Sequence, residues 1–278
     1  MSDQQLITSL NNHVLSIRLN NPKTLNSLTK QIREGLYEAV TRAINDEHVR
    51  AIYLTGNGRS FSAGGDLESI EKFNDPWSTH NRFRQLIQWI TPFVRLQKPV
   101  IVGLNGMAVG GGMGLALSGD ILIAAESAEF RCGFTRIGAI PDFGMMYHLP
   151  RLVGMARAKE FVFRNGIWSA MQAQELGIVS EVVADTELDN KAYDRACELA
   201  AGPVEAMGLA KWLMGRSFET SIEDMMAFES LAQPLAFQTN AHKEGFGALR
   251  EKREVDFPSA SARETWYKSR LETNETED

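Results

Sequence analysis

Short apolar runs alternate with amphipathic stretches along most of the chain. Runs that are apolar throughout, or that alternate apolar with polar residues, are typical of strands and occupy 14–19, 50–56, 98–104, 120–125 and 178–184. From Leu28 to Ile44 apolar side chains recur every fourth residue, which indicates one face of a helix. Residues 78–96 also favour a helix, interrupted near Pro92. Short strands in alternation with helices predict an α/β fold.

Beyond residue 185 the pattern is mainly helical. Amphipathic periodicity covers 187–201, 203–216, 221–233 and 240–252, and the last residues are polar and charged. No Pro/Ser-rich linker or low-complexity block interrupts the chain. We therefore divide it into a core at 1–200, a helical C-terminal region at 201–258 and a polar tail at 259–278.

Composition and charge narrow the classes of function. The 278 residues are 44% apolar, enough for a large core, and a net charge of −6 argues against nucleic acid as the main partner. Cys132 and Cys197 lie far apart without CxxC spacing, so we expect neither a disulfide framework nor a zinc site. This use of cysteine fits a reducing compartment, and we expect a cytoplasmic protein. The histidines are scattered without ligand spacing, and no metal is expected.

The longest apolar stretch, residues 99–125, raises the question of a membrane span. It carries no charge before Asp120. Asn105, Gly106 and a run of three glycines divide it into a strand, a turn and a helix, so we expect a buried core segment and no membrane partner. The first residues also lack the basic and apolar regions of a secretory signal.

Two glycine-rich turns lie between an apolar strand and a helix. One contains Gly65, and the other contains Gly111 within residues 109–120, VGGGMGLALSGD. A glycine inside a helix costs up to about 1 kcal/mol relative to alanine, so glycines at a helix start suggest close approach to the backbone. The first N–H groups of a helix are unpaired, and two that converge on one carbonyl form an oxyanion hole. Tight packing of strand against helix explains the glycines equally well.

Several motifs, taken in order, resemble the enoyl-CoA hydratase/isomerase family, the crotonase superfamily. They are FSAGGDL, KPVIVGLNGMAVGGGMGLALSGDILIAAESAEF, IGAIPDFG, LPRLVGMARAKEF and SAMQAQELGIVSEVV. The resemblance runs from about residue 14 to residue 257, and the combination is specific although no single motif is. It implies a spiral of ββα units with a helical C-terminal trimerisation region, assembled as a homotrimer or as a hexamer of two trimers.

The resemblance also implies a substrate and its contacts. The substrate is an acyl thioester of coenzyme A, and no cofactor beyond the CoA of the substrate is expected. Gly65 and Gly111 match the backbone donors of the family's oxyanion hole. Ala63 matches the position whose backbone meets the adenine.

Three side chains near these turns are further substrate-binding candidates. Asp66 follows Gly65 directly and is also placed to cap a short helix. Met113 is one of the methionines that crowd the glycine turns, either as core filler or as a wall of the acyl pocket. Phe134 stands where aroyl-CoA dehalogenases of the superfamily have a tryptophan near the substrate ring.

Hydratases of the family share two glutamates that handle the attacking water, and neither matching position is acidic here. The matching residues are Gly114 and Phe134. Addition of water across a double bond needs a base for the water and an acid for the carbon. We therefore do not expect efficient hydration.

Asp142, in GAIPDFG, is the remaining acid–base candidate. It is the only carboxylate within ten residues on either side, and apolar neighbours would raise its pKa toward neutrality. Pro-Asp-x-Gly is also ordinary turn chemistry. Several isomerases of the family carry their acid–base carboxylate at this position, although Met145 replaces a second glycine of their motif. We therefore expect a Δ3-to-Δ2 enoyl-CoA isomerisation, or a related double-bond shift, with Asp142 as the proton shuttle.

Three alternatives stay open. The chain could be a hydratase-like protein that lacks both glutamates. It could be an aroyl-CoA dehalogenase or hydrolase with Asp142 as the nucleophile, although Ile87 occupies the position of the dehalogenase histidine base and the nearest histidine is His80. It could also be a weakly catalytic CoA-ester-binding protein, which would bind CoA esters without exchanging the α-proton.

Overall fold

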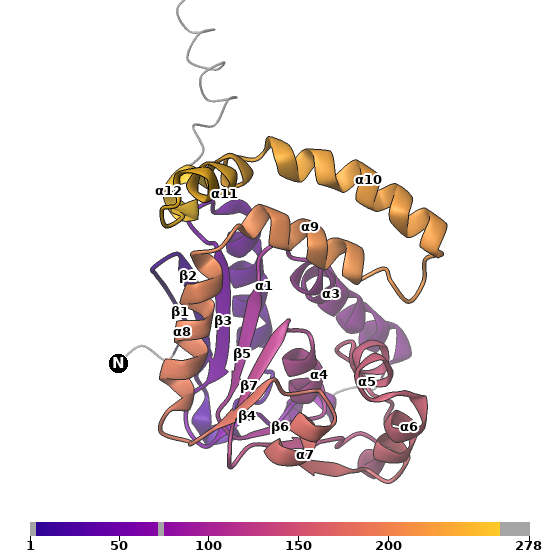
Figure 1. Ribbon diagram of the computed structural model, residues 1–278. Helices are drawn as coiled ribbons and strands as arrows, with labels where there is room; N and C mark the ends of the chain where they lie inside the picture. The colour runs from indigo at the N-terminus through magenta and orange to yellow at the C-terminus, as the bar shows by residue number, and fades with distance from the viewer. Residues whose placement is uncertain (1–3, 72–74, 262–278) are drawn as a thin grey trace, which may run out of the picture.

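The computed structural model describes residues 4–71 and 75–261 (Figure 1). The strands are β1 (Leu6–Asn11), β2 (Val14–Leu19), β3 (Ala51–Gly56), β4 (Ser60–Ser62), β5 (Val100–Leu104), β6 (Met107–Val109), β7 (Ile121–Ala125), β8 (Glu129–Arg131), β9 (Ile167–Ser169) and β10 (Glu181–Val183). The helices are α1 (Lys30–Asn45), α2 (Leu67–Ile70), α3 (Pro76–Val94), α4 (Gly111–Leu117), α5 (Met145–Val153), α6 (Met155–Phe163), α7 (Ala170–Glu175), α8 (Leu188–Ala200), α9 (Val204–Met214), α10 (Ile222–Gln238), α11 (Asn240–Glu251) and α12 (Phe257–Ser261).

The strands form two separate sheets. The larger has the order β1-β2-β3-β5-β7-β10 and is parallel except for the β1–β2 hairpin. The smaller has the order β4-β6-β8-β9 and is parallel except for β9. Along the chain, β3-β4, β5-β6 and β7-β8 each place one strand in each sheet before the next helix. This repeat is the ββα spiral that the resemblance implied.

The larger sheet is buried on both faces, as expected for a parallel sheet. On one face Tyr53 and Ile101 pack against α8, whose alanines Ala192 and Ala196 are fully buried. On the opposite face lie α1, α3 and α4 (Figure 1). Successive strand residues point to opposite faces, so the continuously apolar β5 supplies both clusters.

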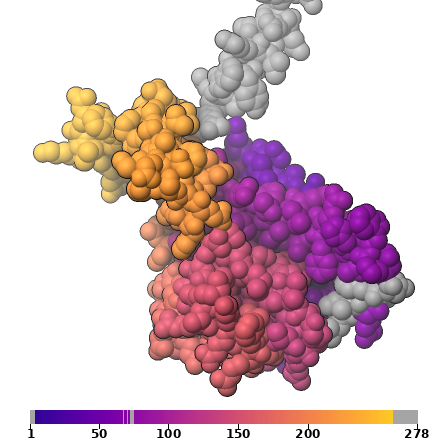
Figure 2. Space-filling model, turned by 90° about the vertical axis from the view of Figure 1, so that its right-hand side faces the viewer, coloured from indigo at the N-terminus to yellow at the C-terminus, as the bar shows by residue number. Residues whose placement is uncertain are grey.

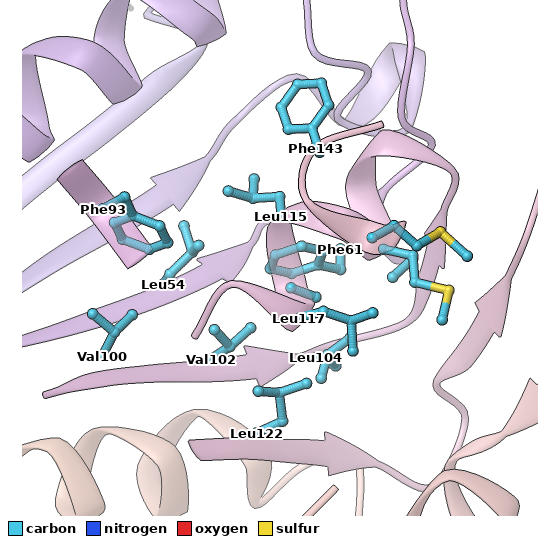
Figure 3. Close-up of a cluster of buried hydrophobic side chains, with 14 of the residues drawn as sticks. Leu54, Phe61, Phe93, Val100, Val102, Leu104, Leu115, Leu117, Leu122 and Phe143 are labelled. Carbon is cyan, nitrogen blue, oxygen red and sulfur yellow. The ribbon is translucent and has the colours of Figure 1, made fainter. Parts of the chain in front are cut away.

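The main hydrophobic core lies on the second face, between the two sheets and the helices. Figure 3 shows strand residues such as Leu54 and Val102 facing Leu115 and Leu117 of α4. Phe143 lies at the edge of this cluster, above Leu115. The helix that begins at the glycine run is therefore part of the core, and every residue of α4 is buried.

Residues 99–125 form β5, β6, α4 and β7, which confirms the prediction of a buried core segment. Within the described part of the chain, no helix is long and apolar enough to cross a membrane.

Several boundaries differ from the sequence predictions. Residues 107–109, predicted as loop, form β6, and β1, β4, β8 and β9 were not predicted. The predicted break near Pro92 is wrong, because α3 continues through Pro92 and ends two residues later at Val94. Likewise, α10 continues through Pro234. Of the predicted polar tail only 259–261 are described, and they belong to α12.

Candidate active site

The two glycine turns touch each other at the start of α4. Gly64 has a φ of +81°, which disfavours any residue with a side chain. A Cβ on Gly64 would lie 2.3 Å from the Val109 oxygen and 3.1 Å from the Gly111 nitrogen. Only glycine therefore allows the turn after β4 to approach the turn after β6 this closely.

The backbone N–H groups of Gly65 and Gly111 are available to a ligand. No acceptor within residues 4–71 and 75–261 receives a hydrogen bond from either group. Gly111 is the first residue of α4, so its N–H lies at the positive end of that helix. Such a pair of donors suits an oxygen that gains negative charge during a reaction.

A buried polar network holds the Gly65 turn, and the sequence analysis missed it. Asn26 is fully buried with a φ of +56°, and its Nδ2 donates to the Asn57 and Ser60 carbonyls at 2.9 Å each. Ser62 Oγ donates to the Asn26 carbonyl at 2.7 Å and accepts from the Gly64 N–H at 3.1 Å. The one available signal was a polar Asn-Ser pair between two leucines, at residues 25–28.

Asp142 lies beside the Gly111 donor. Its Oδ1 is 3.4 Å from the position that a Cβ on Gly111 would occupy. This oxygen is buried and has no hydrogen-bond partner among the described residues. Burial raises the pKa of Asp142 to about 6, and a hydrogen bond from its own backbone N–H opposes the shift only in part. A buried carboxyl that titrates near neutrality is suited to accept and return a proton.

A tight turn carries this carboxyl. The Met145 N–H donates to the Asp142 carbonyl at 3.0 Å, and the two residues between them have positive φ, +50° at Phe143 and +75° at Gly144. These values define a type I′ turn. The local Pro-Asp-x-Gly turn of the sequence analysis is therefore present, and it carries the Asp142 carboxyl, whose acid–base role stays a prediction.

The turn fills the space beside Gly114. A Cβ on Gly114 would lie 2.6 Å from the Phe143 Cβ and 2.9 Å from the Asp142 carbonyl oxygen. A glutamate, which family hydratases have at this position, cannot be accommodated while the turn stays in place. Phe134, at the second glutamate position, is 9% exposed, and its ring edge lies 3.6 Å from a Cβ on Gly110.

The other substrate-binding candidates lie near the same turns. The Ala63 N–H donates to the Leu25 carbonyl at 2.8 Å, and its residue is half-buried. Asp66 directly precedes α2 and accepts a short hydrogen bond from the Ser69 hydroxyl. Met113 is fully buried in the main core, which agrees with its reading as core filler. Contact of these residues with a substrate stays a prediction.

Neither of two cavities on the described surface is lined by Asp142, Gly65 or Gly111, although the second is lined by Gly144 of the Asp142 turn. One, of about 510 Å³, lies between α6, β9 and α7, and the other, of about 550 Å³, lies between α3, α5 and α9. Asp142 is absent from both linings, so the site is identified by the donors and the carboxyl and not by cavity size. Residues 4–71 and 75–261 hold no group of three side chains able to bind a metal ion.

Comparison with known proteins places the chain in a family. The enoyl-CoA hydratase/isomerase family model matches residues 9–260. The chain is 35% identical to the 1,2-epoxyphenylacetyl-CoA isomerase of Escherichia coli (strain K12), with 91% of this chain and 97% of that protein covered. It is 34% identical to the short-chain-enoyl-CoA hydratase of Clostridium acetobutylicum, with 87% and 93% covered.

A solved structure agrees with this assignment. The enoyl-CoA hydratase/isomerase from Cupriavidus metallidurans CH34 matches with a TM-score of 0.87 at 30% identity, and 92% of this chain and 97% of that chain are covered. The chain therefore belongs to the enoyl-CoA hydratase/isomerase family, the crotonase superfamily, whose enzymes act on CoA thioesters.

Proposed function

We propose that this enzyme shifts a carbon–carbon double bond in an enoyl-CoA thioester, from Δ3 to Δ2 or in a related sense. Asp142 takes a proton from the carbon next to the thioester carbonyl. The Gly65 and Gly111 N–H groups hold the dienolate oxygen. The protonated Asp142 then returns the proton two carbons away, so one carboxyl serves both steps and no cofactor is needed beyond the CoA of the substrate.

One observation carries this proposal. The buried Oδ1 of Asp142 has no partner among the described residues and lies beside the Gly111 donor, and the pKa of this carboxyl is raised to about 6. A base with a pKa near the working pH combines a useful ionised fraction with a strong tendency to accept a proton. In this proposal the Oδ1 oxygen of Asp142 gains its partner when the substrate binds, first as the C–H that it deprotonates and then as the transferred proton.

The alternatives share this geometry and differ in what Asp142 does. As a nucleophile it would form an acyl-enzyme that water must hydrolyse, but Ile87, at the position of the dehalogenase histidine, is 59% exposed and cannot act as a base. A hydratase would need carboxylates at two positions that hold Gly114 and Phe134. The names of the relatives include both isomerases and hydratases, so the reaction itself must be measured.

We further propose a homotrimer, or a hexamer of two trimers, in the cytoplasm. Two cysteines without a disulfide between them fit a reducing compartment. The apolar surface of the C-terminal helices, described below, supports assembly.

The test is solvent-deuterium exchange on a panel of 3-enoyl-, 2-enoyl- and aroyl-CoA esters, with wild type beside Asp142→Asn. Arylacetyl-CoA esters are included because one relative is a 1,2-epoxyphenylacetyl-CoA isomerase. We expect α-proton exchange and double-bond migration in the wild type, with a loss of about 100-fold or more in the variant, since asparagine cannot accept the proton.

Other outcomes identify the alternatives. Binding of CoA esters without exchange in either protein contradicts the isomerase and favours a binding protein. An aroyl-enzyme adduct, detected by its mass on the wild type and absent in Asp142→Asn, identifies a nucleophile. Full exchange by Asp142→Asn assigns the proton transfer to another group.

A further inference from the structure

Phe143 has a backbone conformation that its side chain disfavours. Its φ is +50°, at the first central position of a type I′ turn, where asparagine, aspartate or glycine is usual. A left-handed conformation is disfavoured for any residue with a Cβ. Such strain persists only where the surrounding structure enforces it, and it gathers at functional sites.

The ring of Phe143 lies beside the start of α4, the helix whose first residue carries the proposed oxyanion donor. Its Cδ2 and Cε2 lie 3.0 Å and 3.1 Å from the position of a Cβ on Gly111, next to the Asp142 Oδ1 at 3.4 Å from the same point. The ring packs edge-on against Trp89 of α3, with 6.0 Å between ring centroids. Phe143 is 8% exposed and closes the edge of the main core (Figure 3).

We propose that Phe143 is a positioning residue for Asp142. Its ring keeps water from the Oδ1 oxygen, and its packing against Gly111 and Trp89 holds the turn that places the carboxyl beside the donor. The catalytic meaning of this role rests on the proposed function, but the effect on carboxyl protonation does not.

Burial, and not a neighbouring charge, sets the protonation of Asp142. In the described residues α4 carries no charged side chain. On α5, His148 is neutral because burial and Arg151 lower its pKa to about 4. Arg151 itself pairs with Glu219 at 2.7 Å and stacks on Tyr147 at 3.6 Å.

The other element packed against the turn is α3, which carries His80, Arg82 and Arg84, and none of these groups contributes to the shifted pKa of Asp142. Arg82 of α3 interacts electrostatically with Asp66 and Arg33. Removal of the Phe143 ring therefore changes the hydration of Asp142 without changing its charged surroundings.

Three variants test the role. Phe143→Gly deletes the ring, and glycine adopts the left-handed turn without strain, so the backbone is retained. Phe143→Leu replaces the ring by a compact apolar side chain. Phe93→Leu makes the same change in the same hydrophobic cluster, at a buried residue of α3 away from the turn, and is the matched control.

Two readouts are needed. The first is titration of the Asp142 carboxyl by infrared difference spectroscopy against Asp142→Asn, which requires no turnover. The second is the pH profile of α-proton exchange, with kcat and KM determined separately. Thermal unfolding of each variant shows that it is folded under the conditions used.

In Phe143→Gly we expect the carboxyl pKa and the acid limb of the exchange profile to move from about 6 to about 4, with kcat down about tenfold and KM changed by less than about twofold. Phe143→Leu should keep most of the raised pKa, and Phe93→Leu should titrate as wild type. A folded Phe143→Gly that titrates as wild type overturns the inference, even if kcat falls. If the wild type shows no isomerase activity, only the proposed function is contradicted. The titration of Asp142 still reports whether the Phe143 ring shields its carboxyl from water.

Discussion

Asp142 has a stability cost that follows from its burial. The folded protein raises the pKa of this carboxyl from 3.8 to about 6, so between these values the folded state binds a proton more tightly than the unfolded state. Stability therefore falls as pH rises through this window, and the full cost is present above pH 6. A residue that costs stability and nevertheless has its Oδ1 buried near Gly111 fits a chemical role.

This cost predicts how Asp142→Asn changes stability with pH. Because asparagine stays neutral, the variant should be more stable than wild type at pH 7.5, by about 1 to 2 kcal/mol, and equal to it near pH 4. Urea unfolding at the two pH values measures the difference. Equal stabilities at pH 7.5 would show that the carboxylate is better solvated than its burial indicates.

Gly114 is predicted to tolerate no side chain. A Cβ there would meet the Phe143 Cβ at 2.6 Å, so Gly114→Ala should lower the free energy of unfolding by about 2 kcal/mol or more despite the better helix propensity of alanine. The control is Gly247→Ala in α11, where the nearest atom to a new Cβ is an Arg253 nitrogen at 3.8 Å. That change should stabilise by up to about 1 kcal/mol. Similar stabilities of the two variants would contradict the close packing at Gly114.

At the scale of elements, a partly exposed ion pair attaches the first C-terminal helix to the core. Lys211 of α9 contacts the Asp120 Oδ2 at 2.6 Å, and the same oxygen accepts a hydrogen bond from the Val100 N–H at 2.8 Å. Burial raises the pKa of Asp120, and Lys211 opposes that shift. The pair connects α9 to the start of β5 and to the end of α4, the helix that begins with the Gly111 donor.

Removal of this pair should therefore weaken the attachment of α9. Lys211→Met leaves Asp120 without its counter-ion and should destabilise by about 1 to 3 kcal/mol at pH 7.5. The loss should shrink as pH falls, because the raised pKa of Asp120 favours its neutral form at low pH. Lys30→Met removes an exposed pair with Glu34 at 3.6 Å and should cost less than about 0.5 kcal/mol. Thermal or urea unfolding of both variants checks the prediction, and an equal loss in both would contradict it.

The long elements could be predicted from the sequence because periodicity alone specifies them. β2 was predicted with its observed bounds, and α8 and α9 within one or two residues. Each buries a run of apolar residues long enough for its periodicity to be recognised in the sequence. The strands of the smaller sheet are three residues long and owe their existence to pairing across the chain, so no pattern reveals them.

Some residues of the candidate site could likewise be predicted from the local sequence, and others could not. Gly65, Gly111 and Asp142 stand out locally, as glycine turns before helices and as an isolated carboxylate. Asn26 and Phe143 act through residues that are distant in sequence, including Ser60 and Trp89. Their roles depend on contacts that only the folded chain creates.

At the scale of the whole molecule, the C-terminal helices leave an apolar face uncovered. Figure 2 shows α10 and the helices that follow, orange to yellow, projecting beyond the core. In α10 only Ala232 is buried, and its exposed apolar side chains are Ile222, Met226, Leu231, Leu235 and Phe237. Leu231 and Leu235 lie four residues apart on one side of α10, and an exposed apolar helix face of this kind marks an interaction surface.

We predict that this face joins copies of the chain. Leu231 and Leu235 are 69% and 63% exposed and one helical turn apart, so a Leu231→Glu, Leu235→Glu double variant should stay folded and sediment as a monomer. Gln233→Glu, which adds one charge at an exposed position between them, should leave the assembly intact. Analytical ultracentrifugation distinguishes these outcomes, and a wild type that is already monomeric would contradict the proposed trimer.

The contact between Gly114 and Phe143 also limits the mutational paths open to this enzyme. A glutamate at position 114 clashes with the turn that carries Asp142, so the first step toward a two-glutamate hydratase disrupts the existing carboxyl before a new activity can arise. The turn must be rebuilt at the same time, and Phe134 must change as well. Backbone oxygens of Asp142 and Phe143 also lie 2.9 Å from a Cβ on Gly114, so a smaller residue at position 143 does not by itself make room, and positions 114 and 142–144 are expected to change together.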